Sequence, residues 1–414
     1  MQTNLSSEFR DTAQGREAEA ILRACVHCGF CTATCPTYQL LGDELDGPRG
    51  RIYLIKQVLE GDPVTRKTQL HLDRCLTCRS CETTCPSGVE YGRLLDIGRD
   101  IVDAKVGRTP AESAQRWGLR RALLSQSLFA AAIGSARLVK NLLPRALAER
   151  IPSGTRNSAW PAPRHARKML VMEGCVQPAL KPNIDAAMAR VLDRIGISAV
   201  RIAGGGCCGA LSHHLSAEDE AGGIVRRNID AWWPHVQRDV EAVIVTASGC
   251  GVMVKDYGHF LAHDPAYAAK AQRIADVARD PVEIVKANWG EIAPLVAAEK
   301  GAQRVAFHPP CTLQHGMKIR GQVEDVLRAL GHTLEPVADA HLCCGSSGTY
   351  SILQPALAGQ LKVNKLRALE ASRPDVIATA NIGCHTHLES GTRIPVRHWI
   401  ELLDSRMMTS PRRH

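Results

Sequence analysis

Long apolar runs are absent from this 414-residue chain. A membrane-spanning helix needs roughly 18 or more consecutive apolar residues. The most apolar stretch, residues 122–133, is shorter and is interrupted by Ser125, Gln126 and Ser127. The first 14 residues also lack the apolar centre of a signal peptide. We therefore expect a soluble, cytoplasmic protein whose thiols stay reduced and bind metal instead of forming disulfides.

Aromatic residues are scarce, at 4% of the chain, and the sequence shows no convincing nucleotide site. The run Gly204-Gly205-Gly206 is glycine-rich, but it lacks the following Lys-Ser that completes a phosphate-binding loop. No set of acidic and basic side chains indicates acid–base catalysis either. We therefore expect the chain to bind no flavin or nicotinamide, and to leave the chemistry at a carbon centre to another protein.

Acidic residues are nearly missing from one segment. From Arg108 to Lys168 there are twelve Lys or Arg and two acids, so this segment carries +10 while the rest of the chain, whose total is +9, sums to −1. One or two amphipathic helices are indicated by Trp117, Leu119, Leu123, Leu124, Leu128 and Leu138. We expect their apolar face to pack on the preceding residues, and the charge excess to contact an acidic partner or anionic lipid, not nucleic acid.

Cysteine, by contrast, is abundant, with sixteen residues. Eight of them form two runs of identical C-x2-C-x2-C-x3-C-P spacing, the pattern of bacterial two-cluster ferredoxins, in which the fourth cysteine ligates the other cluster. By that pattern cluster 1, a [4Fe–4S] cluster, is held by Cys25, Cys28, Cys31 and Cys85. Cluster 2 is held by Cys75, Cys78, Cys81 and Cys35. The alternative is a redox-silent zinc ribbon, which rarely repeats such a run twice.

The other eight cysteines form a duplicated pattern, Cys175, Cys207, Cys208 and Cys250, then Cys311, Cys343, Cys344 and Cys384. The first interval is 32 positions in both copies, and the last is 42 in one copy and 40 in the other. Each adjacent pair precedes a glycine, Gly209 or Gly345. Two neighbouring thiolates can hold adjacent metal atoms, and glycine lets the backbone come close to them.

Hydrophobic periodicity separates a helical first part from a second part in which strands and helices alternate. In the first part we expect helices over 14–24 and 50–60. In the second we expect strands over 168–172, 200–203, 242–246, 304–307 and 375–378, and helices over 183–195, 218–232, 322–330 and 356–369. The sequence therefore predicts an α+β multidomain protein, with a helical two-cluster ferredoxin-like module followed by two tandem α/β domains. The expected boundaries are 14–106 for the module, 107–167 for the basic helices and a linker marked by Pro152 and Gly154, and 168–300 and 301–405 for the α/β domains.

The paired ferredoxin runs followed by two Cys-Cys-Gly copies resemble the iron–sulfur subunits of glycolate oxidase, within the wider group that carries the cysteine-rich CCG domain. The resemblance covers nearly the whole chain, and the segments His308-Pro309-Pro310-Cys311 and Ile382-Gly383-Cys384-His385-Thr386-His387 carry it most closely. Relatives belong to anaerobic glycerol-3-phosphate dehydrogenase, lactate-utilisation and heterodisulfide reductase systems. The two α/β domains are called the first and second CCG domains below.

The resemblance implies an electron-transfer subunit of a 2-hydroxy-acid dehydrogenase that is not catalytic alone. FAD-containing partner subunits would oxidise glycolate, or D-lactate, and the electrons would reach a quinone or another acceptor. The implied assembly is a cytoplasmic hetero-oligomer with peripheral contact at the inner face of the cell membrane. One alternative is a CCG site that itself reduces a disulfide or a quinone. Another is the iron–sulfur subunit of a related lactate or glycerol-3-phosphate dehydrogenase.

The last position of each CCG motif departs from the family pattern. The complete motif ends in C-x2-C. In this chain the place of the last cysteine is taken by Met253, three positions after Cys250, and by His387, three positions after Cys384. In the heterodisulfide reductase relative, a complete CCG domain holds a non-cubane [4Fe–4S] cluster. With four cysteines in each domain, an additional [4Fe–4S] cluster, a zinc ion and an unloaded thiol site are the alternatives, and we expect metal in at least one domain. His387 is either a ligand or a polar neighbour of the site. The histidine pair His213 and His214, which comes soon after Gly209 of the first motif, is expected to consist of ordinary surface residues.

Overall fold

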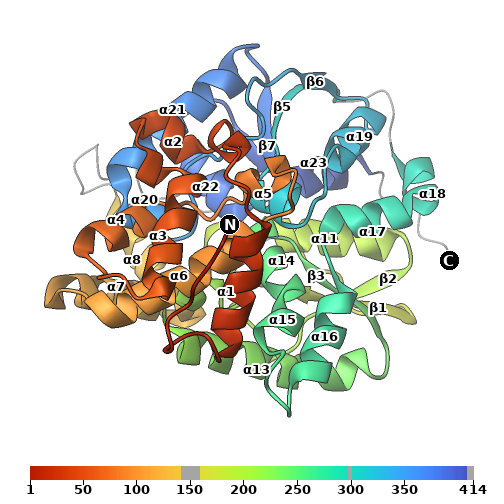
Figure 1. The fold of residues 1–414 in the computed structure, drawn as a ribbon. Helices are drawn as coiled ribbons and strands as arrows, with labels where there is room; N and C mark the ends of the chain where they lie inside the picture. The colour runs from red at the N-terminus through yellow and green to blue at the C-terminus, as the bar shows by residue number, and fades with distance from the viewer. Residues whose placement is uncertain (141–158, 297–300, 408–414) are drawn as a thin grey trace.

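The computed structural model describes residues 1–140, 159–296 and 301–407 and contains one helical module and two parallel sheets (Figure 1). The expected linker at Pro152 and Gly154 lies outside the described residues. The module's helices are α1 (Ala13–Ala24), α2 (Pro36–Leu41), α3 (Pro48–Glu60), α4 (Arg66–Asp73), α5 (Ser80–Thr84) and α6 (Tyr91–Val106), with 3-10 turns η1 (Phe30–Thr32) and η2 (Glu44–Asp46). The helices predicted over 14–24 and 50–60 are confirmed.

Helix α6 forms the centre of the module, because α1, α3 and α4 all pack against it. Its Leu94 and Leu95 are fully buried. The chain enters α1 through Thr12, whose side chain accepts a hydrogen bond from the backbone N–H of Gly15 and so satisfies a free donor of the first turn. It leaves α3 through Gly61, whose φ of +99° is a conformation that favours glycine. The resulting core holds the two cysteine runs in the turns between helices.

Two helices follow the module, α7 (Pro110–Leu124) and α8 (Gln126–Leu138), as the amphipathic pattern predicted. Their expected burial on the module is wrong, because neither helix has a buried residue, and Trp117 and Leu128 are 56% and 53% exposed. Ion pairs hold α7 instead, with Arg116 on Asp73 of the module. Phe129 and Ile133 of α8 pack against the core of the CCG domains. Several arginines of the basic segment are therefore used inside the molecule.

Each CCG domain is built on a four-stranded parallel sheet with its helices around it. The first contains β1 (Arg167–Met172), α10 (Gln177–Leu180), α11 (Asn183–Arg194), β2 (Ile197–Val200), α12 (Ala210–His213), α13 (Glu218–Val236), β3 (Val240–Val245), α14 (Ser248–Lys255), α15 (Tyr257–Phe260), α16 (Ala268–Val277), β4 (Ala278–Arg279), α17 (Pro281–Ala287), α18 (Trp289–Ile292) and η4 (Ala293–Leu295). The second contains β5 (Arg304–His308), the one-turn π-helix η5 (Thr312–Gly316), α19 (Gln322–Ala329), β6 (Thr333–Glu335), α20 (Tyr350–Leu353), α21 (Pro355–Glu370), β7 (Val376–Thr379), α22 (Ile382–Glu389), β8 (Val396–His398) and α23 (Trp399–Arg406).

The two sheets have equivalent topologies, with strand orders β2-β1-β3-β4 and β6-β5-β7-β8. All strand pairs are parallel, which confirms the α+β fold class with two α/β domains after a helical module. The strand predicted over 200–203 is misplaced, because β2 ends at Val200. Gly196, with a φ of +78°, ends the preceding turn, and the chain pairs with β1 from Ile197 onwards. The other predicted strands and helices agree with the structure to within a few residues.

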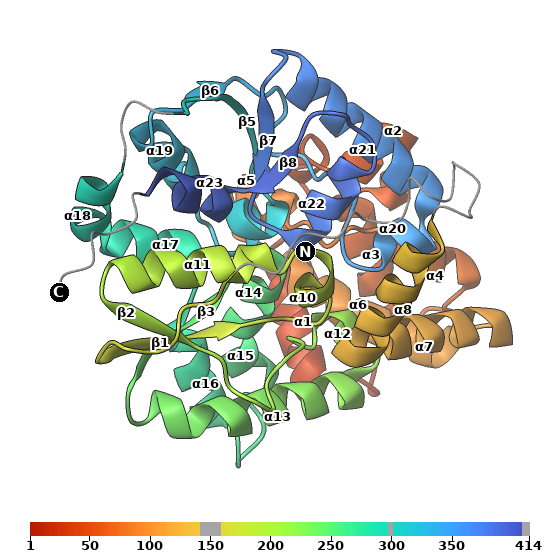
Figure 2. The same cartoon turned by 180° about the vertical axis from the view of Figure 1, so that it is seen from behind.

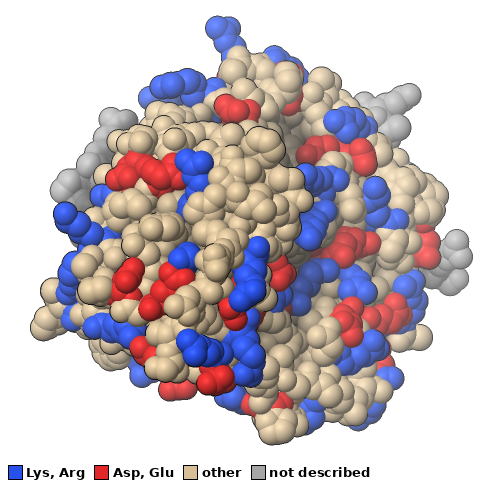
Figure 3. All heavy atoms as spheres, in the orientation of Figure 1, with Lys and Arg blue, Asp and Glu red and all other residues tan. Residues whose placement is uncertain are grey.

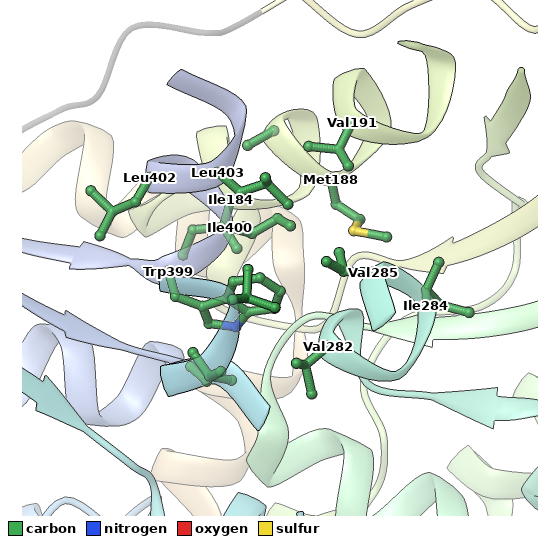
Figure 4. Close-up of a cluster of buried hydrophobic side chains, with 14 of the residues drawn as sticks. Ile184, Met188, Val191, Val282, Ile284, Val285, Trp399, Ile400, Leu402 and Leu403 are labelled. Atoms are coloured by element: carbon green, nitrogen blue, oxygen red, sulfur yellow. The ribbon is translucent and has the colours of Figure 1, made fainter. Parts of the chain in front are cut away.

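One hydrophobic core joins the two CCG domains (Figure 4). Helix α23 of the second domain packs on α11 of the first, and Figure 2 shows the two helices side by side. The labelled side chains of this core are Ile184, Met188, Val191, Val282, Ile284, Val285, Trp399, Ile400, Leu402 and Leu403. Trp399 and Leu403 are fully buried in this shared core, and His398 at the end of β8 lies 3.0 Å from the carbonyl oxygen of Thr246 directly after β3. The domains therefore form a single unit whose strand ends meet.

Charged side chains of both signs are interspersed over the face of the molecule shown in Figure 3. Within the described residues, no helix combines the length and the apolar character needed to cross a bilayer.

Candidate metal centres

The first cysteine run surrounds a small cavity of about 30 Å³. The cysteines that line it are Cys25, Cys28, Cys31, Cys81 and Cys85. Cys25 follows the last residue of α1, and Cys85 follows α5, so helix ends place both sulfurs at the cavity. Cys85 comes from the second run, and it is the residue that the ferredoxin pattern assigns to cluster 1.

The second run surrounds a cavity of about 10 Å³. Its cysteines are Cys35, Cys75, Cys78 and Cys81, the four that the pattern assigns to cluster 2. Both cavities share Cys81 and Tyr91, so the two sites are neighbours.

Equivalent backbone turns form the two runs. The residue before the second cysteine has a positive φ in each, His27 at +56° and Thr77 at +53°, and so has the residue after it, Gly29 at +84° and Arg79 at +59°. Left-handed backbone is unfavourable for residues other than glycine. The same unusual turn therefore occurs in both runs, and in both it places cysteines around a cavity.

The protonation of these thiols fits a bound cationic group. Burial raises the pKa of Cys78 and Cys81 well above the usual value, and burial also raises the pKa of Cys31 to about 11. Such thiols ionise when a metal takes the place of the proton, because thiolate is the form that ligates. The buried donor set is therefore suited to iron, which thiolates favour.

A fully buried arginine lies beside the second cavity. Arg51 lines that cavity, donates to the backbone carbonyl of His71 at 2.7 Å and pairs with Asp46 at 3.4 Å. Asp46 is also bound by Nδ1 of His71 at 3.1 Å and by Arg74 at 2.9 Å. Burial opposes the ionisation of Arg51, but the charges of Cys75 and other nearby acidic groups outweigh it and raise the pKa. Arg51 thus places a permanent positive charge next to the thiols of the second cavity.

The remaining eight cysteines lie at the carboxyl ends of the parallel strands, where α/β sheets bind ligands. Cys175 and Cys311 follow β1 and β5, and Cys250 and Cys384 are each the third residue of a helix, α14 and α22. Backbone N–H groups donate to sulfur in both copies, from Gly209 to Cys207 at 3.5 Å and from Gly345 to Cys343 at 3.4 Å. The duplicated sequence pattern is therefore a duplicated arrangement in space. Gly204, Gly206 and Gly209 have the G-x-G-x-x-G spacing of dinucleotide-binding loops. Cys207 and Cys208 between them line a cavity that is rich in cysteine sulfurs, so we do not assign a nucleotide site there.

The glycine of each Cys-Cys-Gly motif has left-handed backbone, with φ of +93° at Gly209 and +91° at Gly345. A Cβ at Gly345 would lie 2.7 Å from the carbonyl oxygen of Ala358, whereas at Gly209 the nearest atom would be 3.3 Å away on Val225. We expect Gly209→Ala to cost about 1–2 kcal/mol from backbone strain alone. Gly345→Ala should cost about 3 kcal/mol or more, because the collision with backbone adds to the strain. Urea midpoints of the two variants test this, and equal losses would contradict it.

Thiol protonation differs between the two CCG domains. Cys175 and Cys208 hydrogen-bond to Cys207 and hold the pKa of that thiol well below its usual range, while their own pKa values rise. In the second domain, hydrogen bonding and burial raise the pKa of Cys311, and burial contributes to the raised pKa of Cys343 and Cys344. Most of these thiols are therefore neutral until a cation binds them.

A cavity of about 490 Å³ connects the two CCG sites with the module. Its lining includes Cys75 of the module and seven CCG cysteines, Cys175, Cys207, Cys208, Cys250, Cys311, Cys343 and Cys384. Cys78 packs in one buried cluster with Cys311 and Cys343, so the second cavity of the module lies against the second CCG domain. Hydrogen bonds fix this contact, from Ser347 Oγ to the carbonyl of Leu76 at 2.6 Å and from the Tyr350 hydroxyl to the carbonyl of Arg74 at 3.1 Å.

A histidine that the sequence pattern did not predict as a ligand lies beside two of the second-domain cysteines. A ring nitrogen of His308 and the Sγ atoms of Cys344 and Cys384 lie within 4.8 Å of one another. His387 lines the large cavity, but its Nε2 lies 3.3 Å from the carbonyl oxygen of Ala358. Met253, at the corresponding position of the first domain, is buried in the hydrophobic core. His308 could have been found from its place at the end of a strand, three positions before Cys311.

The pair His213 and His214 is not ordinary surface, because it joins the module to the first CCG domain. His213 lies 2.8 Å from Glu218 and 3.4 Å from Asp96 of α6, and only 18% of its side chain is exposed. Burial alone would lower the pKa of His213, but the charge of Asp96 and the hydrogen bonds of both carboxylates raise it to about 10. The imidazolium therefore stabilises the contact between the two parts of the chain at neutral pH.

This contact makes stability depend on pH. Because the pKa of His213 is higher in the folded chain than its unfolded value of about 6.5, the stabilisation is complete below about pH 6.5 and is lost as the pH rises through about 10. We expect His213→Gln to cost about 1.5 kcal/mol near pH 6.5, a value typical of charged hydrogen bonds, and almost nothing at pH 10. Urea midpoints across that range measure the difference, with the exposed His263→Gln as control. A constant difference would contradict the proposed titration.

Comparisons with known proteins agree with this geometry. A 4Fe-4S dicluster domain matches residues 21–89, and a cysteine-rich CCG domain matches residues 169–255 and 305–389. The glycolate oxidase iron–sulfur subunit of Escherichia coli (strain K12) is 54% identical over 98% of both chains. A probable glycolate oxidase iron–sulfur subunit of Bacillus subtilis (strain 168) is 27% identical over 94% of this chain and 92% of its own. Lactate utilization protein A of Bacillus licheniformis is 25% identical over 56% of this chain and 97% of its own.

These similarities confirm the predicted electron-transfer iron–sulfur protein with two [4Fe–4S] clusters. They do not favour the alternative of a disulfide or quinone reductase, since two relatives that match more than nine tenths of the chain are named as glycolate oxidase iron–sulfur subunits. With 54% identity along almost its entire length, the chain belongs to the family of glycolate oxidase iron–sulfur subunits.

Proposed function

We propose that this chain transfers electrons within a glycolate-oxidising complex, from FAD-containing partner subunits to a quinone or another acceptor. The substrate assignment, glycolate or a similar 2-hydroxy acid such as D-lactate, is supported by the names of the relatives. The chain itself supplies no acid–base site for the oxidation in this proposal, and it acts only together with its partners. Peripheral contact with the inner face of the cell membrane would bring it to a quinone.

A row of adjoining sulfur sites carries the proposal. The cavity at the first run meets the cavity at the second through Cys81, and Cys78 of the second meets Cys311 of the second CCG domain. When bound, [4Fe–4S] clusters supply one-electron transfer, which matches a two-electron flavin to one-electron steps. The residues of this chain place such sites next to one another and bury most of their cysteines. That arrangement is what an electron-transfer subunit requires.

We infer crossed ligation at the two module sites, with Cys25, Cys28, Cys31 and Cys85 holding cluster 1 and Cys75, Cys78, Cys81 and Cys35 holding cluster 2. The lining of the two small cavities supports these sets. We also infer that the CCG cysteines bind metal in at least one domain. Seven of them line one cavity, most of them are buried, and the pKa values of Cys311 and Cys344 are raised, all of which supports metal binding there.

The partner flavoprotein is proposed to approach the chain at the first run. Cys28 is exposed, unlike the cysteines of the second cavity, and beside it Val26 and Phe30 are 68% and 61% exposed. Exposed apolar side chains over a redox site suit a partner that must come close to it, because apolar contacts of this kind stabilise interfaces. At the opposite end of the row, all four cysteines of the second CCG domain are buried.

A pair of valine variants tests this surface. Val26→Asp should lower the rate of electron transfer from the flavoprotein about fivefold or more, as expected when an interface side chain worth about 1 kcal/mol is lost. Val363→Asp, at a 54% exposed valine on α21, is the matched control and should leave the rate unchanged. The iron content of both variants must equal that of the wild type. Equal rates for the two variants would place the flavoprotein elsewhere.

Anaerobic reduction with defined donors tests the function itself. The chain is purified together with its flavoprotein subunits, and the reduced-cluster EPR signal is followed after addition of glycolate, D-lactate or glycerol 3-phosphate. Glycolate should reduce the clusters only when the flavoprotein is present. Reduction by glycolate without the flavoprotein would make the chain an enzyme in its own right. Reduction by glycerol 3-phosphate but not by either hydroxy acid would assign it to the other kind of dehydrogenase.

A further inference from the structure

A buried histidine without any partner lies in the second CCG domain. His308 is the last residue of β5 and is 1% exposed. Neither of its two ring nitrogens has a hydrogen-bond partner among the described residues. Buried polar atoms are normally paired, since leaving them unpaired costs free energy. A ring nitrogen of His308 instead lies within 4.8 Å of the sulfurs of Cys344 and Cys384.

A structural role is easily recognised in a neighbouring histidine, and His308 lacks its features. His398 ends β8 and is also fully buried. Both of its nitrogens are used, one near the carbonyl oxygen of Thr246 at 3.0 Å and the other accepting from the backbone N–H of Ile400 at 3.2 Å. Among the described residues, a ring nitrogen of His308 groups instead with the thiols of Cys344 and Cys384, as expected around a metal ligand.

The first CCG domain provides an internal comparison. Met172 ends β1 and stands three positions before Cys175, as His308 ends β5 and stands three positions before Cys311. Met172 is 4% exposed and lies in a hydrophobic cluster. The duplicated fold therefore tolerates an apolar side chain at this position, and packing alone does not require a histidine.

A second pair of equivalent positions also has an apolar side chain in the first CCG domain and a polar one in the second. Ile229 of α13 and Lys365 of α21 both stand 21 positions after the second cysteine of the pair. Both are buried, but Lys365 brings an ammonium group that donates to the carbonyl of Asp339 at 2.7 Å. The second domain thus surrounds its cysteines with an imidazole and an ammonium group where the first has two apolar side chains.

We propose that His308 is a nitrogen ligand of an iron–sulfur centre in the second CCG domain, beside Cys344 and Cys384, whereas the first domain offers thiolates alone. Imidazole and thiolate together suit iron. The proposal rests on the inferred metal binding by the CCG cysteines. Because both domains have four cysteines, the neutral imidazole adds a ligand without adding negative charge. Histidine ligation accompanies a raised potential in other iron–sulfur centres. The nearby Lys365 adds a positive charge, which favours reduction of the second-domain centre.

The test uses full-length protein, purified anaerobically after growth with 15N-histidine, in a Cys207→Ser/Cys208→Ser background that leaves only one CCG centre. Pulsed EPR of the reduced and oxidised states should show a histidine nitrogen coupling. His308→Met, which installs the residue of the first domain, should abolish the coupling. It should also speed the loss of iron to a chelator about 10–100-fold, the range typical of a disturbed metal shell. His387→Gln is the matched control and should change neither quantity.

The possible results separate a failure of metal binding by the CCG cysteines from a failure of ligation by His308 alone. About eight irons per chain in the wild type, with none in either CCG domain, would remove the inferred metal binding and the ligation with it. Iron above eight, with equal chelator kinetics in His308→Met and His387→Gln and no nitrogen coupling, would overturn the ligation alone. Faster iron loss without a nitrogen coupling would also overturn it, because His308 would then act through a hydrogen bond. Zinc in place of iron would overturn the iron–sulfur assignment. The wild-type spectrum is informative even if His308→Met fails to fold.

Discussion

Replacing Cys85 by serine is expected to remove cluster 1, although Cys85 belongs to the second cysteine run. The cavity of the first run is lined by Cys25, Cys28, Cys31 and Cys85, so the lost sulfur faces that site. Iron should fall by about four atoms per chain, and the remaining EPR signal should be that of cluster 2. The reverse holds for Cys35→Ser, which should remove cluster 2, because Cys35 lines the other cavity.

The decisive comparison is between pairs of variants. Cys85→Ser should leave the same residual spectrum as Cys28→Ser, and Cys35→Ser the same residual spectrum as Cys78→Ser. Because the members of each pair lie in different runs, only crossed ligation predicts this grouping. If Cys85→Ser matched Cys78→Ser instead, each run would hold its own cluster and the inferred ligand sets would be wrong.

The second large effect is expected at Arg51. Its side chain is 0% exposed and pairs with Asp46, which is 1% exposed. Arg51→Met leaves part of the charge of Asp46 uncompensated in the interior, and breaking a buried pair in this way costs about 3–5 kcal/mol. The loss should appear as a lower urea midpoint of the anaerobic protein. The potential of cluster 2 should fall as well, because a positive charge beside its thiolates is removed.

Two further variants separate the effect of the broken ion pair on stability from the effect of the lost positive charge on the potential of cluster 2. Arg23→Met removes an exposed pair with Glu19 and should cost no more than about 1 kcal/mol. Arg51→Met combined with Asp46→Asn should recover part of the stability, since the unpaired buried charge is gone. The potential should recover only in part in that double variant, because Arg51 lines the cavity of cluster 2 and Asp46 does not. An unchanged potential in Arg51→Met alone would show that the charge of Arg51 does not set it.

The spacing of the cysteines was sufficient to predict the two-cluster module, and the alternation of strand and helix patterns predicted the two α/β domains. This success has a local cause, because a turn such as Cys25-x2-Cys28-x2-Cys31 is determined by the few residues within it. Alternating strand and helix periodicity likewise reports on short segments. Where a boundary depended on a neighbouring strand, as at 200–203, the prediction failed, because the pairing of β2 with β1 decides where the strand lies.

Contacts between distant segments were decided only by the tertiary structure. Cys78 and Cys311 are 233 positions apart in the sequence, yet they pack together because α5 and η5 meet. Arg116 of the basic segment pairs with Asp73, so part of a charge excess that suggested a partner is used internally. The sequence also pointed to His387, whereas the register of β5 places His308 beside the thiols. A sequence states which chemical groups are present. Their burial and the distances between them arise only when separate elements pack, and these two quantities determine the pKa values of the groups and which of them can bind a metal together.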